Sequence, residues 1–125
     1  MQDIYNDQTY LNNNPTWGED DAYLKAEAIT KLIKRNNVSF NIALEAGCGS
    51  GEILVQLEKK FPDAERFYGY DISRDVISIA SKKQTEKIRF ESGDIKSVGV
   101  YADLWLIIMV NTHKFQCRQQ LNWQE

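Results

Sequence analysis

Three glycines stand at alternate positions between a strand-like and a helix-like part of this 125-residue chain. They are Gly47, Gly49 and Gly51, in the stretch LEAGCGSGEIL. Residues 39–47 alternate apolar and polar side chains, which predicts a strand, and residues 53–61 return to helical spacing. Because glycine inside an element costs roughly 0.5–1 kcal/mol relative to alanine, the cluster predicts a tight turn whose backbone another group approaches closely.

Helices and strands alternate along the rest of the chain. An apolar stripe of Ala22, Ala26, Ile29 and Ile33 predicts a helix that starts at Asp20 and ends before Asn36. Further strands are expected at 66–71, 87–94 and 102–110, with a helix at 73–83 that Ser73 caps and that turns Val76, Ile77 and Ala80 inward. This order predicts right-handed crossovers and a Rossmann-like α/β fold with an open, mainly parallel sheet of about four strands and flanking helices.

The three parts of the chain differ in pattern. Residues 1–19 are expected to form an irregular arm, residues 20–110 the folded domain, and residues 111–125 a tail without regular structure. The strand at 102–110 is almost continuously apolar, so we expect it to be buried on both faces.

Composition excludes several classes of protein. Hydrophobic residues make up 42% and charged residues 26%, and the net charge is −3 with the basic residues scattered. A soluble globular domain is therefore expected, without a nucleic-acid-binding face, a membrane span or a targeting signal. Two cysteines and one histidine argue against a disulfide framework or a zinc site, and favour a reducing, cytoplasmic setting.

The glycine spacing does not suit a phosphate ligand. A dinucleotide fingerprint needs a third small residue where this chain has Glu52, whose carboxylate would compete with an anion at the helix N-terminus. Residues 41–58 contain no lysine or arginine, and the G-K-[ST] sequence of a P-loop is absent. A purely structural turn and an atypical dinucleotide site remain the alternatives.

Acidic residues end three successive predicted strands. They are Glu45, Asp71, which lies twenty residues after Gly51, and Asp94. The carboxyl edge of an open α/β sheet is where such folds bind ligands, and the spacing of Asp71 suits a ribose. A nucleoside with a positively charged, phosphate-free tail would match these acids. Alternatively, Asp71 caps the helix beside Ser73, and Asp94 belongs to an ordinary turn.

The motifs ALEAGCGSGEIL, FYGYDIS, RFESGDI and ADLWLII together resemble the first half of a class I S-adenosylmethionine-dependent methyltransferase domain. The resemblance covers roughly residues 40–108. It implies S-adenosylmethionine as cofactor and methyl transfer to an unknown acceptor, with a small molecule favoured. No general base is evident, so no catalytic residue is assigned.

The resemblance also implies the residues that bind the cofactor. Glu45 would lie near its amino-acid end, and Asp71 would bind the ribose. Ile72 and Ile95 would lie beside the adenine, and Asp94 would contact the adenine amino group. The backbone of the turn would run along the cofactor at Ala46, Gly47, Cys48, Gly49 and Gly51. On its own chemistry, Cys48 is expected to be a small buried residue and not a nucleophile.

The chain also departs from that family. Such domains have about seven strands, whereas four are expected here, which suggests a truncated domain whose activity is in question. The apolar edge of the strand at 102–110 is then expected to cause self-association, unless the tail folds back across it. Two rival functions are a non-catalytic cofactor-binding or interaction remnant and an NAD-dependent oxidoreductase.

Overall fold

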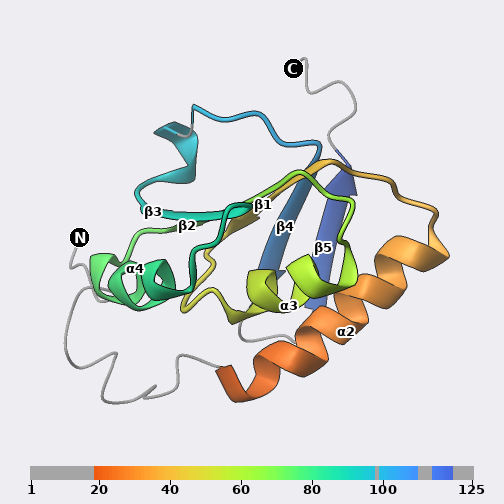
Figure 1. Cartoon of the computed structure of the whole chain (residues 1–125), viewed down its shortest axis with the longest axis horizontal. Coiled ribbons are helices and arrows are strands. Elements are labelled where there is room, and N and C mark those ends of the chain that lie inside the picture. Colours follow the sequence, from red (N-terminus) through yellow and green to blue (C-terminus); the bar gives the residue numbers. More distant parts are fainter. Residues whose placement is uncertain (1–18, 98, 110–113, 120–125) are drawn as a thin grey trace.

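A computed structural model describes residues 19–97, 99–109 and 114–119 of the chain. It contains one five-stranded sheet and three helices of two or more turns among those residues (Figure 1). In chain order the elements are α2 (Glu19–Arg35), β1 (Ile42–Ala46), α3 (Glu52–Lys60), β2 (Arg66–Asp71), α4 (Arg74–Ala80), η2 (Ser81–Lys83), β3 (Ile88–Ser92), η3 (Ile95–Ser97), β4 (Leu104–Met109) and β5 (Lys114–Gln119).

The sheet has the strand order β3-β2-β1-β4-β5. The first four strands are parallel, which confirms the predicted α/β class. The chain builds outward from β1 to β3 and then returns to place β4 on the other side of β1. The strand order therefore reverses between β1 and β4, and at such a point open α/β sheets leave a crevice for ligands.

The prediction that the tail has no regular structure is wrong for residues 114–119. These residues form β5, which pairs antiparallel with β4 in the register Leu106↔Cys117. β5 thus covers the edge of β4 at which we expected self-association. That expectation held only if the tail did not fold back across this edge, and residues 114–119 do fold back across it. The pattern of β5 is weak, with apolar residues only at Phe115 and Cys117, and its backbone hydrogen bonds come from pairing with the edge of β4. Residues 1–18 of the predicted arm lie outside the described residues, and its last residue, Glu19, instead begins α2.

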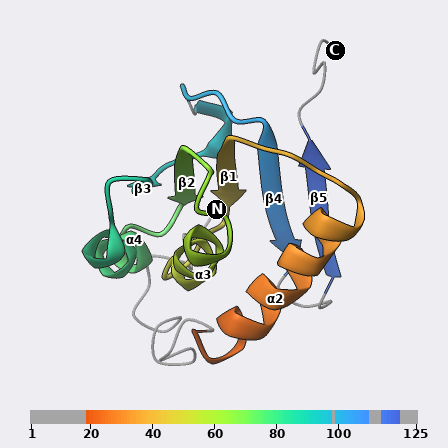
Figure 2. The same cartoon turned by 45° about the vertical axis from the view of Figure 1, so that its right-hand side comes forward.

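All three helices lie on one side of the sheet (Figure 2). They cover a core to which the predicted stripe of α2 contributes, with every member of the stripe at most 3% exposed. From α3 the core receives Leu54 and Leu57. The predicted inward residues of α4 are buried as well, and Ser73 caps this helix by accepting a hydrogen bond from Val76 N–H. The predicted helix at 73–83 ends earlier, at Ala80, and continues as η2.

The opposite face of the sheet is covered only in part. Its apolar residues include Leu44, Tyr70 and Trp105, and they pack with Val100 and Ala102 from the connection between β3 and β4. None of α2, α3 and α4 lies on this face, which receives only Ile95 from the short helix η3, and Ile107 of β4 is 42% exposed. The expectation that β4 is buried on both faces is therefore wrong, although Leu104 and Leu106 on its other face are buried. Among the described helices, none has the length and apolarity that crossing a bilayer requires.

Candidate functional site

The glycine loop, residues 47–51, follows β1 at the carboxyl edge of the sheet and leads into α3. It lies where the strand order reverses between β1 and β4. Gly47, Gly49 and Gly51 have φ values of 74°, 56° and 84°. These left-handed values favour glycine, so the loop needs glycine for its backbone path.

The missing side chains of the glycines leave space, and different neighbours use that space at different glycines. A Cβ on Gly51 would lie 2.6 Å from Cε1 of Phe90, and one on Gly69 of β2 would lie 2.6 Å from Cδ1 of the same ring. Phe90 of β3 therefore packs against the backbone at both positions. A Cβ on Gly47 would meet no atom within 4 Å. Of these three glycines, only Gly47 has free space beside its Cα that a ligand could occupy.

Backbone hydrogen bonds tie the glycine loop to the end of β2. The N–H groups of Gly47 and Cys48 both donate to the carbonyl oxygen of Tyr70, at 2.7 and 3.0 Å. The Asp71 carboxylate accepts from Gly49 N–H through Oδ2 and from Ser73 N–H through Oδ1, both at 2.9 Å. The contact with Ser73 is a local turn contact, and the side chain that caps α4 is that of Ser73, so the alternative that Asp71 caps this helix is wrong. Because a carboxylate oxygen can accept more than one hydrogen bond, Asp71 keeps acceptor capacity for a ligand.

Glu45 is buried, with 1% of its surface exposed. It lies on β1 between Gly69 of β2 and Leu106 of β4 in the strand register. Its Oε1 has no hydrogen-bond partner among the described residues. Burial, with a smaller contribution from the negative charge of Asp71, raises the pKa of Glu45 well above its ordinary value, while Lys25 opposes the shift. A buried acceptor without a partner is costly, so this carboxyl group is suited to gain one from a ligand.

The residues after β2 and β3 lie at the same edge. Ile72 is 52% exposed directly after Asp71. The backbone N–H of Gly93 donates to the Asp71 carbonyl oxygen at 2.9 Å, which joins the turn after β3 to the end of β2. Asp94 is exposed, and its Oδ1 accepts from Lys96 N–H at 2.9 Å, as in an ordinary turn. Ile95 is partly buried against the second face of the sheet.

Two further predicted residues lie next to the glycine loop and within it. Ala46 ends β1, and Cys48 is buried at 6% exposure. Burial raises the pKa of the Cys48 thiol well above its ordinary value, with Glu45 and Asp71 adding to the shift. The thiol therefore stays protonated, which agrees with a packing role and not with a nucleophile. Within the described residues, no group of three or more His, Cys, Asp or Glu side chains is arranged for a metal ion.

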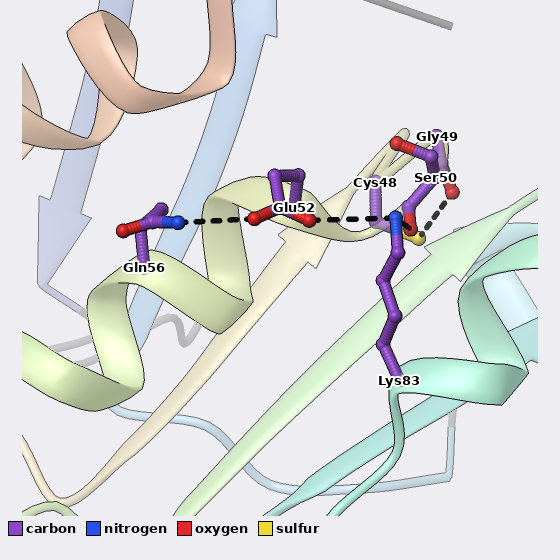
Figure 3. Close-up of polar contacts among 6 residues, drawn as sticks. All are labelled: Cys48, Gly49, Ser50, Glu52, Gln56 and Lys83. Atoms are coloured by element: carbon purple, nitrogen blue, oxygen red, sulfur yellow. Dashed lines mark hydrogen bonds and ion pairs between the residues drawn. The ribbon is translucent and has the colours of Figure 1, made fainter. Parts of the chain in front are cut away.

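The sequence argument missed a cation at the glycine loop. No lysine or arginine occurs between residues 41 and 58, but Lys83 of η2 reaches the loop in three dimensions (Figure 3). Its Nζ donates to the carbonyl oxygen of Ser50 at 3.0 Å and lies 3.4 Å from Oε2 of Glu52. The absence of lysine and arginine from residues 41–58 therefore does not mean that Glu52 has no cation beside it. Glu52 is nevertheless the first residue of α3, at the helix N-terminus, as predicted.

Comparisons with known proteins agree with this geometry. Residues 43–124 match the family described as methyltransferase domain. The trans-aconitate 2-methyltransferase of Deinococcus radiodurans is 38% identical over 61 residues, which cover 49% of this chain and 23% of that protein. The release factor glutamine methyltransferase of Bacteroides thetaiotaomicron is 32% identical over 90 residues, which cover 69% of this chain and 32% of that protein.

Solved structures give the same result. The plantazolicin methyltransferase BpumL, in complex with SAH, superposes with a TM-score of 0.61 at 27% identity. The match covers 82% of this chain and 39% of BpumL. The chain thus spans well under half the length of the relatives that it matches. With its four parallel strands, its glycine loop at the strand reversal and a family match over residues 43–124, the chain belongs to the methyltransferase domain family.

Proposed function

We propose that this domain binds S-adenosylmethionine at the glycine loop and belongs to an enzyme that transfers its methyl group to an acceptor. The observation that carries the proposal is the open approach to Gly47 beside Glu45, a buried acid whose Oε1 has no partner among the described residues. A ligand with a cationic amino group and no phosphate suits these surroundings. BpumL, a methyltransferase of similar fold, is in complex with SAH (S-adenosylhomocysteine).

The residues at this edge have the chemistry that the cofactor needs. In this proposal Asp71 accepts from the ribose hydroxyls with its remaining acceptor capacity, and Glu45 accepts from the amino group. The exposed Ile72 and the partly buried Ile95 contact the adenine, and the Asp94 carboxylate accepts from its amino group. The backbone from Ala46 to Gly51, including Cys48 and Gly49, runs along the ligand.

The cofactor supplies an already activated methyl group on its sulfonium, so the protein mainly binds and orients. The residues around the glycine loop hold the nucleoside in one place, and holding two reactants in line contributes up to roughly 7–11 kcal/mol to the lowering of a barrier. Such a role, binding and orienting, needs no general base, and none is evident among the described residues.

A small molecule is the proposed acceptor. The name of the Deinococcus relative specifies trans-aconitate, and the acceptor of BpumL is named as plantazolicin. The Bacteroides relative is named for a protein substrate, release factor, so protein acceptors are the competing class. We also propose that the protein acts in the cytoplasm, which the free, buried Cys48 thiol supports.

Calorimetric titration tests the proposed cofactor. S-adenosylmethionine and S-adenosylhomocysteine are expected to bind, and NAD is not. Preferential binding of NAD would support the oxidoreductase alternative, and no binding of any nucleoside would contradict the proposal. Transfer of radiolabelled methyl groups to small-molecule and protein fractions then tests activity. Cofactor binding without transfer would identify the non-catalytic alternative.

A further inference from the structure

We propose that Lys83 is a positioning residue for the cofactor: it holds the glycine loop in its ligand-binding conformation through Ser50 and Glu52. This inference rests on the proposed function, because it concerns the same loop. Lys83 does not contact the open side of Gly47 in the described structure, so its effect on a ligand would act through the loop.

Lys83 makes two contacts with the loop and the helix start. It lies in η2, 33 residues after Ser50, and its Nζ donates to the Ser50 carbonyl oxygen at 3.0 Å. The same Nζ lies 3.4 Å from Oε2 of Glu52, the first residue of α3. The other Glu52 oxygen, Oε1, accepts from Nε2 of Gln56 at 3.0 Å, one helical turn further on. Figure 3 shows Lys83, Glu52 and Gln56 in one continuous line of contacts.

The contact with Ser50 occurs where the loop is least restrained by its own sequence. Ser50 lies between Gly49 and Gly51, and glycine has the largest choice of backbone conformations. Gly51, the N-cap of α3, provides no side-chain hydrogen bond to the helix. The hydrogen bond from Lys83 orients the peptide group between Ser50 and Gly51 and thereby restricts the backbone at Gly51.

The ion pair also controls charge at the helix N-terminus. Glu52 and Lys83 side chains are each 25% exposed, so solvent screens their attraction only in part. A carboxylate in the first turn is stabilised by the helix dipole, and Lys83 offsets its charge. Paired in this way, the lysine is not left as an isolated cation that would recruit a phosphate to the loop.

The chain contains a matched ion pair away from the loop. Lys60 Nζ lies 2.9 Å from Oε1 of Glu27 and joins the end of α3 to α2, with side-chain exposures of 28% and 34%. Because both pairs involve α3 and are similarly exposed, Lys60→Gln controls for the general effect of losing one ion pair on this helix.

The test compares Lys83→Gln, Lys83→Arg and Lys60→Gln with the wild-type chain. S-adenosylhomocysteine affinity is measured by calorimetry, and stability is measured by urea unfolding. Lys83→Gln is expected to weaken binding at least fivefold, and Lys60→Gln less than twofold. Lys83→Arg keeps the charge and a donor, so most of the affinity should return. Equal affinities in Lys83→Gln and the wild type, or equal losses in Lys83→Gln and Lys60→Gln, would overturn the inference.

Hydrogen exchange of the ligand-free proteins separates this inference from the proposed function. Lys83→Gln is expected to speed amide exchange in peptides that cover residues 47–57, with little change in peptides of α2. Unchanged exchange at 47–57 would overturn the inference even if affinity fell. If the wild-type chain bound no S-adenosylhomocysteine, the proposed function would fail, and exchange alone would decide whether Lys83 orders the loop.

Discussion

The carboxylate of Asp71 accepts a hydrogen bond from the backbone N–H of Gly49 at 2.9 Å, across the gap between the loops that follow β2 and β1. The same carboxylate accepts from Ser73 N–H at the start of α4. One side chain therefore joins two helix-leading turns at the ligand edge of the sheet. This arrangement links the stability of the glycine loop to the acid proposed to bind the ribose.

Replacing Asp71 by Asn is expected to reduce both stability and cofactor affinity. The amide retains one acceptor oxygen, so one of the two backbone N–H groups loses its partner, which costs about 1–3 kcal/mol of folding free energy. The affinity for S-adenosylhomocysteine should fall by a similar free energy because a ribose hydroxyl also loses its acceptor. Urea unfolding and calorimetry measure the two effects.

Asp103 provides the matched control at the opposite edge. Its carboxylate accepts from Asn41 N–H at 2.9 Å and from Ile42 N–H at 2.8 Å, so it joins the start of β1 to the start of β4. Asp103→Asn should lower stability comparably but leave affinity unchanged. A wild-type affinity in Asp71→Asn would remove the ribose assignment.

Alanine substitutions at Gly47 and Gly51 are expected to have different consequences. Both residues have left-handed φ values, which cost an L-residue about 1–2 kcal/mol. At Gly51 the new methyl group also meets Phe90, which adds about 1–3 kcal/mol of overpacking. Gly51→Ala should thus be the less stable variant in urea unfolding.

Gly47→Ala should primarily impair ligand binding, since its methyl group would enter the space left open for the ligand. Trimming the ring in the double variant Gly51→Ala/Phe90→Leu should recover part of the stability that Gly51→Ala loses. Full cofactor affinity in Gly47→Ala would show that no ligand approaches this glycine.

The stability of the ligand-free protein is expected to decrease as the pH rises above the ordinary pKa of a glutamate. Burial raises the pKa of Glu45 in the folded state, so above 4.5 the folded protein holds a proton that the unfolded chain has released. The stabilisation is complete below that pH and is lost as the pH rises toward the higher pKa of the folded state. In the Glu45→Gln variant this side chain cannot titrate, so the variant should lack this part of the pH dependence. Urea unfolding at several pH values measures the difference.

Glu45 should also couple ligand binding to pH. The proposed ligand amino group favours the ionised carboxylate, so binding releases a proton and affinity rises with pH in the same window. Glu45→Gln should bind S-adenosylhomocysteine about 1.5–3 kcal/mol more weakly at high pH, with a smaller pH dependence. Identical pH profiles for the two proteins would argue against contact between Glu45 and the amino group.

Removal of residues 111–125 is expected to cause self-association. This deletion removes β5 and exposes the edge of β4, whose unpaired backbone groups can pair with another chain. Sedimentation velocity should show larger species for the deletion variant than for the full chain. Adding Ile107→Lys places a charge on the exposed edge strand and should reduce the association. A monomeric deletion variant would contradict this expectation.

Local pattern predicted the part of the fold that depends on neighbouring residues in the chain. The stripe of α2, the Ser73 cap and the strand at 66–71 were all evident because apolar periodicity and capping chemistry act over a few residues. The alternation of strands and helices also predicted the parallel sheet, since a crossover helix favours this arrangement. The burial of Cys48 was likewise predicted from its place in a tight turn.

The partners of the candidate site residues were decided only by the tertiary structure. Lys83 reaches Ser50 from 33 residues away, and Phe90 packs under Gly51 and Gly69 from a different strand. The exposure of Ile107 and the pairing of β5 with β4 likewise depend on which elements lie against β4. The amino-acid composition of a strand does not predict which elements these are. The sequence by itself thus determined the order of elements and the glycine turn, through short-range sterics and hydrophobic periodicity. Only folding brought Lys83 and Phe90 to that turn, because their contacts join segments that are distant along the chain.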